Sequence, residues 1–536
     1  MEKRTLIALA LSFLVLGFYP VVLKKIYPDY MKEKPKVSAT AKADSSALPV
    51  KGAITAFPRS PLESAGNIPY KNDKLRLIFN SITGSIHHVE FLKYAGHGKN
   101  QFLEILPPKE IPVVPTWVEL SGASQVPYYD FQKVGQENFN FVGSSEKIKI
   151  TKKYEFASSG YSATLKIRFE NISKETQPLD YVLYAGPNFE PRNSIDMQYI
   201  ESDFYSHKDG KEEIRHIKES KLDKKITSAG SVEWVAAKDR HFSIILKPVG
   251  ADNFTAVHEG LGKHHFRAGL VSPKTILPAG GSVEQEFLLY IGPNELEELL
   301  PLGLDPIVNF GKLDMIGKLL VGALEMLHKG TRNYGLAIIA LTALINLILF
   351  PLTRQGYMSM KRMQLIQPQM TKLREQHKKN PEKLNREMME LYKKHKVNPF
   401  GGCLPMLLQM PVFIALYVAL SKSVILINAK LFWIKDLSSP DSVGLPFTLP
   451  VLGNEIHVLP LIMVAAMAIQ QKLMQVKMEG QDPAMESQQK MMATMMPIIF
   501  GFIFYKMPSG LVLYWLTNTL LMTAYQIHLK KVTLTT

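Results

Sequence analysis

Residues 334–352 read YGLAIIALTALINLILFPL and contain no charged side chain. At a rise of 1.5 Å per residue, a helix of this length crosses the hydrocarbon core of a bilayer, which is about 30 Å thick. Three more apolar stretches follow along the chain, at 404–420, 459–469 and 496–527. This part of the chain therefore predicts a bundle of membrane-spanning helices.

The apolar stretch at 496–527 is too long for a single span. A charge, a proline and a glycine interrupt it at residues 506–510, KMPSG, and such a sequence ends one helix and forms a turn. We therefore expect two antiparallel spans there, at about 489–505 and 509–529. Together with the other three stretches they make a five-span core within residues 331–536.

The N-terminus predicts a sixth span. Residues 6–23 are almost wholly apolar, and Lys24-Lys25 follows them in place of a small-residue cleavage site. We interpret residues 1–25 as an uncleaved membrane anchor, with a cleaved signal peptide as the alternative. Residues 26–69 are rich in Ala, Ser, Pro and Lys without an apolar period, which is typical of a flexible linker.

Residues 70–295 carry the pattern of a large antiparallel β-sandwich domain. Short runs that alternate apolar and polar residues predict strands with one wet face, and turns that contain glycine separate them. No convincing amphipathic helix lies between the runs, which favours a sandwich. The clearest runs are 75–79, 147–150, 163–169 and 242–246.

Residues 305–330 predict an amphipathic helix. Leu and Phe side chains recur there at helical spacing, while Lys312, Lys318 and Glu325 lie elsewhere on the helical wheel. Because the segment directly precedes a span, we expect the helix to lie at the membrane interface. An ordinary helix packed on the β-domain is the alternative.

The loop between the spans at 334–352 and 404–420 is strongly basic and fixes the predicted orientation of the chain. Basic residues are concentrated in the cytoplasmic loops of membrane proteins. The loop is therefore predicted to be cytoplasmic, which places both chain termini in the cytoplasm and the β-domain outside it. Its basic residues, against only four glutamates, are Arg354, Lys361, Arg362, Lys372, Arg374, Lys378, Lys379, Lys383, Arg386, Lys393, Lys394 and Lys396.

The same loop, residues 355–396, has the pattern of a helical hairpin, with a break at 378–381, KKNP. Two interpretations are equally open. The hairpin is either a solvated connector or a basic surface for anionic lipid headgroups, ribosomal RNA or acidic partners. Because membrane topology accounts for these basic residues, the net charge of +15 requires no DNA partner.

Uncharged polar residues interrupt the apolar spans. Thr342 and Asn346 lie four residues apart and hence on one helix face. Two interpretations are open: such residues hydrogen-bond across closed helix interfaces, or they line an aqueous cavity. The polar residues that we expect to meet Thr342 and Asn346 from other spans are Gln409, Thr494, Thr517, Asn518 and Thr519.

The sequence offers no pattern for an enzyme. It shows no metal-ligand spacing, no phosphate-binding loop and no nucleophile with its base, so we predict no metal and no cofactor. The pairs His87-His88 and His264-His265 point to opposite faces of a strand and cannot readily share a metal. A small-molecule transporter should show inverted repeats and ionised residues within its spans, and neither is present. Since Cys403 is the single cysteine, no intrachain disulfide holds the β-domain.

Several short motifs occur in a fixed order along the C-terminal part of the chain. They are FPLT at 350–353, Met360, QP at 367–368, VNPFGGCLP at 397–405, QMPVF at 409–413, FWIKDL at 432–437 and MPSGLVLYW at 507–515. These motifs resemble the YidC/Oxa/Alb family of membrane protein insertases. In the β-domain, WVA at 234–236 and YIGP at 290–293 further resemble the branch of this family found in Gram-negative bacteria.

The resemblance implies a membrane protein insertase or chaperone of the bacterial inner membrane, with a periplasmic β-domain and no enzymatic activity. It also implies that five spans enclose a hydrophilic groove that is open to the cytoplasm and to lipid. The polar part of a nascent chain enters this groove, and its apolar helix leaves along the third and fifth spans into the bilayer. Implied partners are nascent membrane proteins, membrane lipids, the Sec translocon and, at the basic hairpin, the ribosome and the signal-recognition machinery.

One position departs from the family pattern. The family typically has a groove arginine five residues before the proline that is Pro351 here, where this chain has Asn346. Thr342 and Trp515 do match positions implicated in substrate contact. Arg354 lies about 12 Å further along the helix and is rotated by roughly 80°, so it replaces the missing charge only in part. We therefore expect a neutral groove lined by Thr342, Asn346, Gln409, Thr494, Trp515 and Asn518, with Arg354, Lys361 and Arg362 on its cytoplasmic side.

Overall fold

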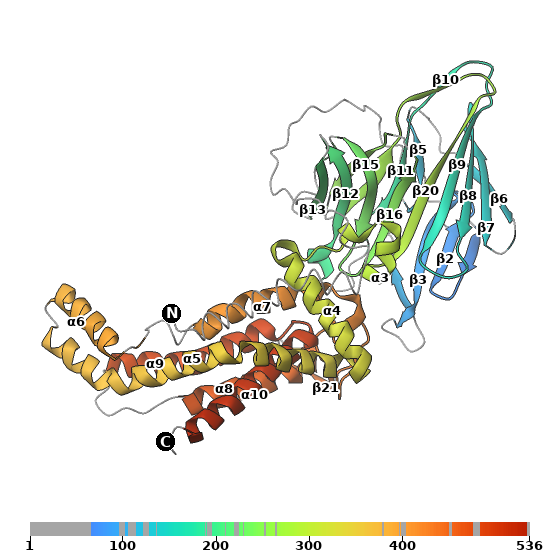
Figure 1. The fold of residues 1–536 in the computed structure, drawn as a ribbon. Coiled ribbons are helices and arrows are strands. Elements are labelled where there is room, and N and C mark those ends of the chain that lie inside the picture. The colour runs from blue at the N-terminus through green and yellow to red at the C-terminus, as the bar shows by residue number, and fades with distance from the viewer. Residues whose placement is uncertain are drawn as a thin grey trace. The chain divides into compact units, whose positions relative to one another are not determined.

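The computed structural model has a β-rich part up to residue 308 and a helical part from residue 309 onward (Figure 1). The predicted N-terminal span, residues 1–25, and the predicted linker as far as residue 65 lie outside the described residues. The structure describes residues 66–95, 102–105, 114–121, 128–133, 135, 137–187, 189, 196–208, 211–218, 225–228, 230–250, 253–262, 265–377, 380–395, 397, 404–449, 453–474 and 483–532.

A nine-stranded antiparallel sheet is the frame of the β-rich part. Buried and half-buried residues alternate along its central strands, because successive side chains of a strand point to opposite faces. In spatial order the strands are β13 (Lys211–Lys218), β12 (Glu201–Lys208), β15 (Ser231–Lys238), β16 (Phe242–Val249), β20 (Ser282–Pro293), β9 (Ser162–Asn171), β8 (Ile148–Phe156), β7 (Asn138–Ser144) and β6 (Tyr128–Lys133).

Smaller antiparallel sheets accompany the nine-stranded sheet. One has the order β1 (Asn67–Lys71), β2 (Leu75–Asn80), β3 (Ser85–Ala95), β4 (Phe102–Ile105). A second has the order β14 (Ile226–Thr227), β17 (Thr255–Gly262), β18 (His265–Val271), β11 (Tyr181–Pro187), β5 (Val118–Leu120). A ribbon of β10 (Gln177–Leu179) and β19 (Thr275–Leu277) and the short helices η2 (Asp196–Tyr199), α3 (Leu296–Leu299), η4 (Leu300–Leu302) and η5 (Asp305–Ile307) complete this part.

Aromatic contacts join the two smaller sheets to the nine-stranded sheet. The rings of Phe79 on β2 and Tyr154 on β8 lie 4.9 Å apart, and those of Phe169 on β9 and Tyr181 on β11 lie 4.5 Å apart. All four side chains are fully buried, and such aromatic pairs stabilise a core beyond the area that they bury. The two layers form a β-sandwich, as the alternating sequence pattern predicts.

One strand is more buried than the sequence analysis predicts. The runs at 75–79, 147–150 and 163–169 lie on β2, β8 and β9, which confirms these strands. The run at 242–246 was expected to have one wet face, but all five of its residues are buried. Strand β16 also contacts β11 of a smaller sheet. Even Ser243 is buried, and its hydroxyl donates to the side-chain oxygen of Asn294 at 2.5 Å.

A lysine lies within the sandwich core. Lys152 on β8 is 1% exposed, and its ammonium group donates to the carbonyl oxygens of Thr83 at 3.1 Å and Thr116 at 3.0 Å and to the hydroxyl of Ser85 at 3.1 Å. These partners are uncharged, so burial is not offset by a carboxylate among them and lowers the pKa of Lys152 to about 7. Lys152 thus joins β8 to two segments outside its own sheet.

The helical part contains the predicted apolar spans. Helix α5 packs on α10, α10 packs on α8 and α8 packs on α9, while α7 lies against α4 and α5. Figure 1 shows α5, α7, α8, α9 and α10 running alongside one another, with α4 crossing them. The helices are η6 (Gly311–Leu313), α4 (Asp314–Thr331), α5 (Tyr334–Gln376), α6 (Pro381–Lys394), α7 (Leu404–Lys422), η7 (Val424–Leu426), α8 (Val458–Met474), α9 (Pro483–Phe504) and α10 (Ser509–Val532).

Helix α5 extends well beyond the predicted span. It begins after Asn333, whose side chain accepts the backbone N–H of Leu336 as an N-cap, and it continues through Pro351 and Pro368. The first half of the predicted hairpin is therefore part of α5, and α6 is the second half. The side chain of Asn380 caps α6, since it accepts the backbone N–H of Lys383 at 3.1 Å.

Among the described residues, one helix is long and apolar enough to cross a bilayer, over Tyr334–Met363. Shorter apolar helices cover Gln409–Lys422, Val458–Leu473 and Thr494–Phe504. The break that KMPSG predicts lies between the end of α9 and the start of α10. The count of six spans remains a prediction.

The amphipathic helix differs from its prediction in where it begins and in what covers its apolar face. It was expected over residues 305–330, but α4 begins at Asp314, because Gly311 adopts a left-handed φ of 75° that interrupts the helix. Its apolar face is covered by protein, since Leu320 and Leu324 belong to the core that α5 and α7 share. Lys318, expected on the polar face, is buried and pairs with Asp314 at 2.9 Å.

Candidate functional site

The predicted groove residues of α5 and α10 meet directly. Thr342 is fully buried and its hydroxyl donates to the carbonyl oxygen of Ile338 at 2.7 Å. The side-chain amide of Asn346 donates to the carbonyl oxygen of Thr342 and to the side-chain oxygen of Asn518, both at 2.9 Å. Asn346 and Asn518 are each half-buried. The structure therefore joins three of the six predicted groove residues through one hydrogen-bonded chain.

Gln409 has another partner than the one predicted. Its side-chain amide donates to the hydroxyl of Tyr514 on α10, so it does not depend on Asn346 for a hydrogen bond. Tyr514 is fully buried and was not among the predicted polar partners. A signal was present, because Tyr514 lies four residues before Asn518 and therefore on the same side of α10.

Trp515 lies in an aromatic cluster between three helices. Its ring centroid is 4.9 Å from that of Phe413 on α7, and 5.1 and 5.4 Å from those of Phe500 and Phe504 on α9. The edge-on contact with Phe413, at 79°, is a favoured aromatic geometry. Trp515 thus connects α10 to the two helices that were predicted to guide an apolar substrate segment.

The remaining predicted residues take no part in the hydrogen bonds described above. Thr494 on α9 is exposed. Arg354 and Arg362 are exposed and Lys361 is half-buried on the C-terminal half of α5. The structure therefore brings together Thr342, Asn346 and Asn518 of the six predicted residues. Gln409 contacts α10 separately through Tyr514, and Trp515 of α10 contacts α7 and α9.

Helices α7 and α9 expose apolar side chains on their outer faces. Phe502 is 87% exposed and Ile498 is 58% exposed on α9, and Ile414 is 44% exposed on α7. Exposed apolar side chains of this kind are suited to contact with lipid or with another apolar helix.

The loop between α7 and α8 is hydrogen-bonded to one end of the bundle, and it contains the hairpin of β21 (Val443–Leu449) and β22 (Gly453–Ile456). The N-terminal N–H groups of a helix need acceptors, and the loop supplies them. Ser509 and Gly510 of α10 donate to the carbonyl oxygens of Ser439 at 2.8 Å and Leu437 at 2.9 Å. One carboxylate oxygen of Asp441 accepts the first N–H groups of α8, from Val458 at 2.9 Å and Leu459 at 2.8 Å.

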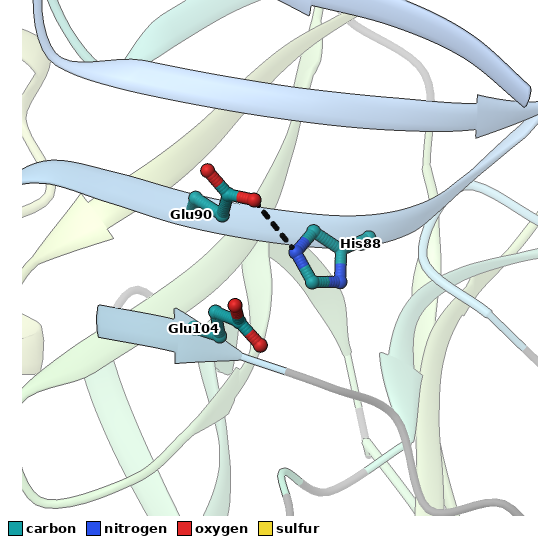
Figure 2. A group of neighbouring side chains, drawn as sticks. All are labelled: His88, Glu90 and Glu104. Carbon is teal, nitrogen blue, oxygen red and sulfur yellow. Dashed lines mark hydrogen bonds and ion pairs between the residues drawn. The ribbon is translucent and has the colours of Figure 1, made fainter. Parts of the chain in front are cut away.

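Two groups of side chains in the described β-domain have ligand atoms close enough for a metal ion, within 4.8 Å of one another. Figure 2 shows His88 and Glu90 on β3 with Glu104 on β4. Here His88 lies 3.3 Å from one oxygen of Glu90, and Arg76 lies 2.8 Å from the other. These contacts already occupy both oxygens of the Glu90 carboxylate, and Arg76 on β2 forms a cross-strand ion pair with it.

The second group is Glu201, Asp203 and His216 on β12 and β13. The ammonium group of Lys238 lies among them, 2.5 Å from Asp203 and 3.3 Å from Glu201. Burial alone would raise the pKa of Asp203, but the charges of Lys238 and His216 lower it to about 2. A cation of the protein itself thus occupies the place that a metal would need.

The fold and the site together define a class: a protein with a β-sandwich domain and an apolar helical bundle that contains a polar network. Two family models match the chain, one described as 60Kd inner membrane protein over residues 326–535 and one described as YidC periplasmic domain over residues 67–323. The chain belongs to the YidC family of membrane protein insertases, which are inner-membrane proteins with a periplasmic domain.

Individual relatives agree with the family models. The chain is 35% identical to the membrane protein insertase YidC of Cupriavidus necator over 415 residues, which are 73% of this chain and 68% of the relative. It is 31% identical to the membrane protein insertase YidC of Geotalea daltonii, with 99% of each chain covered. A solved structure of an active YidC insertase with its first transmembrane domain resolved is 21% identical, covers 95% of this chain and 99% of its own, and has a TM-score of 0.35.

Proposed function

We propose that this insertase receives the polar segment of a nascent membrane protein in a groove around Asn346 and Asn518 and releases the adjoining apolar helix into the bilayer. The observation that carries the proposal is the half-buried pair of amide side chains within apolar helices. Polar groups at membrane depth are costly unless they meet each other or water. A neutral polar lining lowers the cost for an incoming polar segment, because it supplies hydrogen-bonding partners.

The exit path in this proposal follows α7 and α9. Their exposed side chains, among them Ile414 and Phe502, offer an apolar surface beside lipid. Trp515 lies between these helices and the polar network, so one end of a substrate helix would contact aromatic rings while its polar neighbour contacts Asn518. The α7–α8 loop is hydrogen-bonded to the first residues of α8 and α10. This arrangement favours a groove that does not open at that end of the bundle.

The proposal includes the orientation of the chain in the membrane and a count of six membrane spans. The basic side chains on the second half of α5 and on α6 belong in the cytoplasm by the distribution of positive charge. This orientation places the β-domain and the α7–α8 loop in the periplasm and both termini in the cytoplasm. Helix α4 then lies at the periplasmic interface beside the bundle.

We further propose that the hairpin of α5 and α6 is a cytoplasmic contact site for the ribosome or the signal-recognition machinery, and that the chain acts alone or with the Sec translocon. The hairpin has a small core of its own, with Ile366, Met370 and Val397 buried. None of the residues of α6 is buried, so its charged side chains are available to acidic or RNA partners.

Depletion of the protein tests the main proposal. Membrane insertion of small single-span and double-span proteins should fall when the protein is depleted and recover when the intact chain is supplied, as measured by protease protection of the translocated segments. Unchanged insertion in depleted membranes would contradict the proposal. Cross-linking from position 518 to the polar segment of an arrested substrate tests the groove itself, with exposed position 347 on α5 as the control.

A further inference from the structure

Two aromatic side chains project from the α7–α8 loop into the surroundings. Phe432 is 83% exposed and Trp433 is 39% exposed, and their rings are stacked with centroids 6.3 Å apart. Exposed lysines, Lys430 and Lys435, flank them in sequence. We call these four residues the aromatic tip. Exposing two adjacent aromatic side chains to water is unfavourable because of the hydrophobic effect. We therefore expect apolar groups to cover the aromatic tip.

The aromatic tip is held rigidly. The backbones of Leu431 and Ile434 exchange hydrogen bonds at 3.0 and 2.9 Å, and both side chains are buried in the bundle core. The indole N–H of Trp433 donates to the carboxylate of Asp441 at 3.1 Å. Phe432 adopts a left-handed φ of 51°, a conformation that is unfavourable for a bulky residue. The fold therefore stabilises an arrangement that turns Phe432 outward.

The position of the aromatic tip along the bundle is set by its contacts with the start of α5. The side-chain amide of Asn333 donates to the carbonyl oxygen of Lys430 at 2.9 Å, and Leu431 packs so closely on Gly335 that an added Cβ would lie 2.7 Å from it. The apolar run of α5 begins at Tyr334. The tip therefore lies at the level where the hydrocarbon core of the membrane begins.

We propose that the aromatic tip inserts into the headgroup region of the bilayer leaflet at this end of the bundle and fixes the depth of the α7–α8 loop there. Aromatic side chains favour this interfacial region, and the ammonium groups of Lys430 and Lys435 match the charge of lipid phosphates. The proposal follows from the membrane location of the family and stands whether or not the groove proposal holds.

Fluorescence quenching by brominated lipids tests the proposal on the intact chain in vesicles of phosphatidylethanolamine and phosphatidylglycerol. The emission of Trp433 is obtained by subtracting the emission of the Trp433→Phe variant, which keeps an aromatic ring, from that of the unchanged protein. We expect bromines near the headgroup to quench this emission strongly, bromines near the bilayer centre to quench it weakly, and aqueous iodide to have little effect. Trp234, which is fully buried in the β-domain, is the reference. Its emission, obtained in the same way from Trp234→Phe, should not be quenched.

Two outcomes would overturn the proposal. Strong quenching by iodide would show that the aromatic tip faces water. Emission that neither bromine label nor iodide changes would show that protein covers the tip, either the β-domain of the same chain or another copy. Should Trp433→Phe fail to fold, a nitroxide label on Phe432→Cys gives the same depth, with Cys403→Ser added so that Cys403 is not labelled as well. The depth follows from the label's relative accessibility to oxygen and to a water-soluble nickel complex, and the same two outcomes would overturn the proposal.

Discussion

The side-chain nitrogen of Asn346 lies 2.9 Å from the side-chain oxygen of Asn518, and this hydrogen bond joins α5 to α10 within an apolar bundle. The bond is compatible with both interpretations of the polar residues. It can hold two helices together, and it can be one wall of a groove from which Asn518 is released when a substrate binds. The two roles differ in what happens when either partner is removed.

A double-mutant cycle separates the two roles. If the bond holds the helices together, Asn346→Ala and Asn518→Ala each lower the free energy of unfolding, and the two changes couple by about 0.6 kcal/mol and at most about 1.7 kcal/mol. The measurement is reversible unfolding in mixed micelles. Insertion activity should then fall only as far as stability does.

The cycle of Asn346→Ala with Thr523→Ala is the matched control. Thr523 is also on α10, but its hydroxyl donates within the helix to the carbonyl oxygen of Thr519 at 2.7 Å, so this cycle should show no coupling. If the Asn346–Asn518 cycle also shows none while insertion is lost, the pair serves the substrate and not the helix contact.

Gly335 should be required for the fit of the α7–α8 loop on α5. A Cβ there would lie 2.7 to 2.9 Å from three side-chain atoms of Leu431, which is shorter than van der Waals contact allows. Gly335→Ala should therefore destabilise the protein by about 1–3 kcal/mol, as overpacking does. Gly322→Ala on α4 is the control, because a Cβ there meets nothing within 4 Å. Equal thermal unfolding temperatures for the two variants in detergent would contradict this fit.

Several features of the fold and the site could be predicted from the sequence because they depend on local pattern. The apolar run of α5, the break before α10 and the alternating strands are of this kind. The burial of residues 242–246 of β16 also had a signal, since the run contains consecutive apolar residues at Ile244, Ile245 and Leu246, which is typical of a strand covered on both faces.

Features that depend on how elements are placed next to each other could not be predicted. Helix rotation decides that Gln409 bonds to Tyr514 and not to Asn346. Strand register decides that Glu104 lies directly opposite Glu90. His87 and His88 cannot readily share a metal with each other, but register brings Glu104 of another strand close to His88. Similarly, helical spacing placed Lys318 on a polar face, whereas the packing of α4 on the bundle buries it.

Lys152 should make the stability of the β-domain depend on pH. Its pKa falls from 10.5 when unfolded to about 7 when folded, so between these values the unfolded chain binds more protons. Stability is therefore greatest above the unfolded pKa, decreases as pH falls from about 10.5 to 7, and is constant below, with a total change of at most roughly 5 kcal/mol. We expect Lys152→Met to remove this slope, measured by denaturant unfolding of the intact protein at each pH.

Lys149→Met is the control for this titration. Lys149 lies on the same strand, but its side chain is 43% exposed and 3.9 Å from Glu170, so its removal should leave the slope between pH 7 and 10.5 in place. A slope that survives in Lys152→Met would mean that Lys152 keeps its proton in the folded protein.

The proposed groove should accept a positive charge at position 346. Asn346→Arg introduces there the arginine that the family resemblance implies for a groove. We expect it to preserve insertion or to increase insertion of substrates with acidic N-terminal tails, because a half-buried cation attracts an incoming carboxylate. The variant loses the bond to Asn518, so a modest loss of stability should accompany the change. The measurement is protease protection of tails that differ only in their number of acidic residues.

Leu347→Arg is the matched control for that experiment, since Leu347 is the next residue of α5 and is 69% exposed on the outer face. A charge there would face lipid, at a cost of about 2.5–3.5 kcal/mol on the insertion scale, and should give no preference for acidic tails. If Asn346→Arg is folded and yet abolishes insertion, or if both variants respond alike to tail charge, position 346 does not face the substrate. The polar network around Asn518 would then serve only to hold α5 and α10 together.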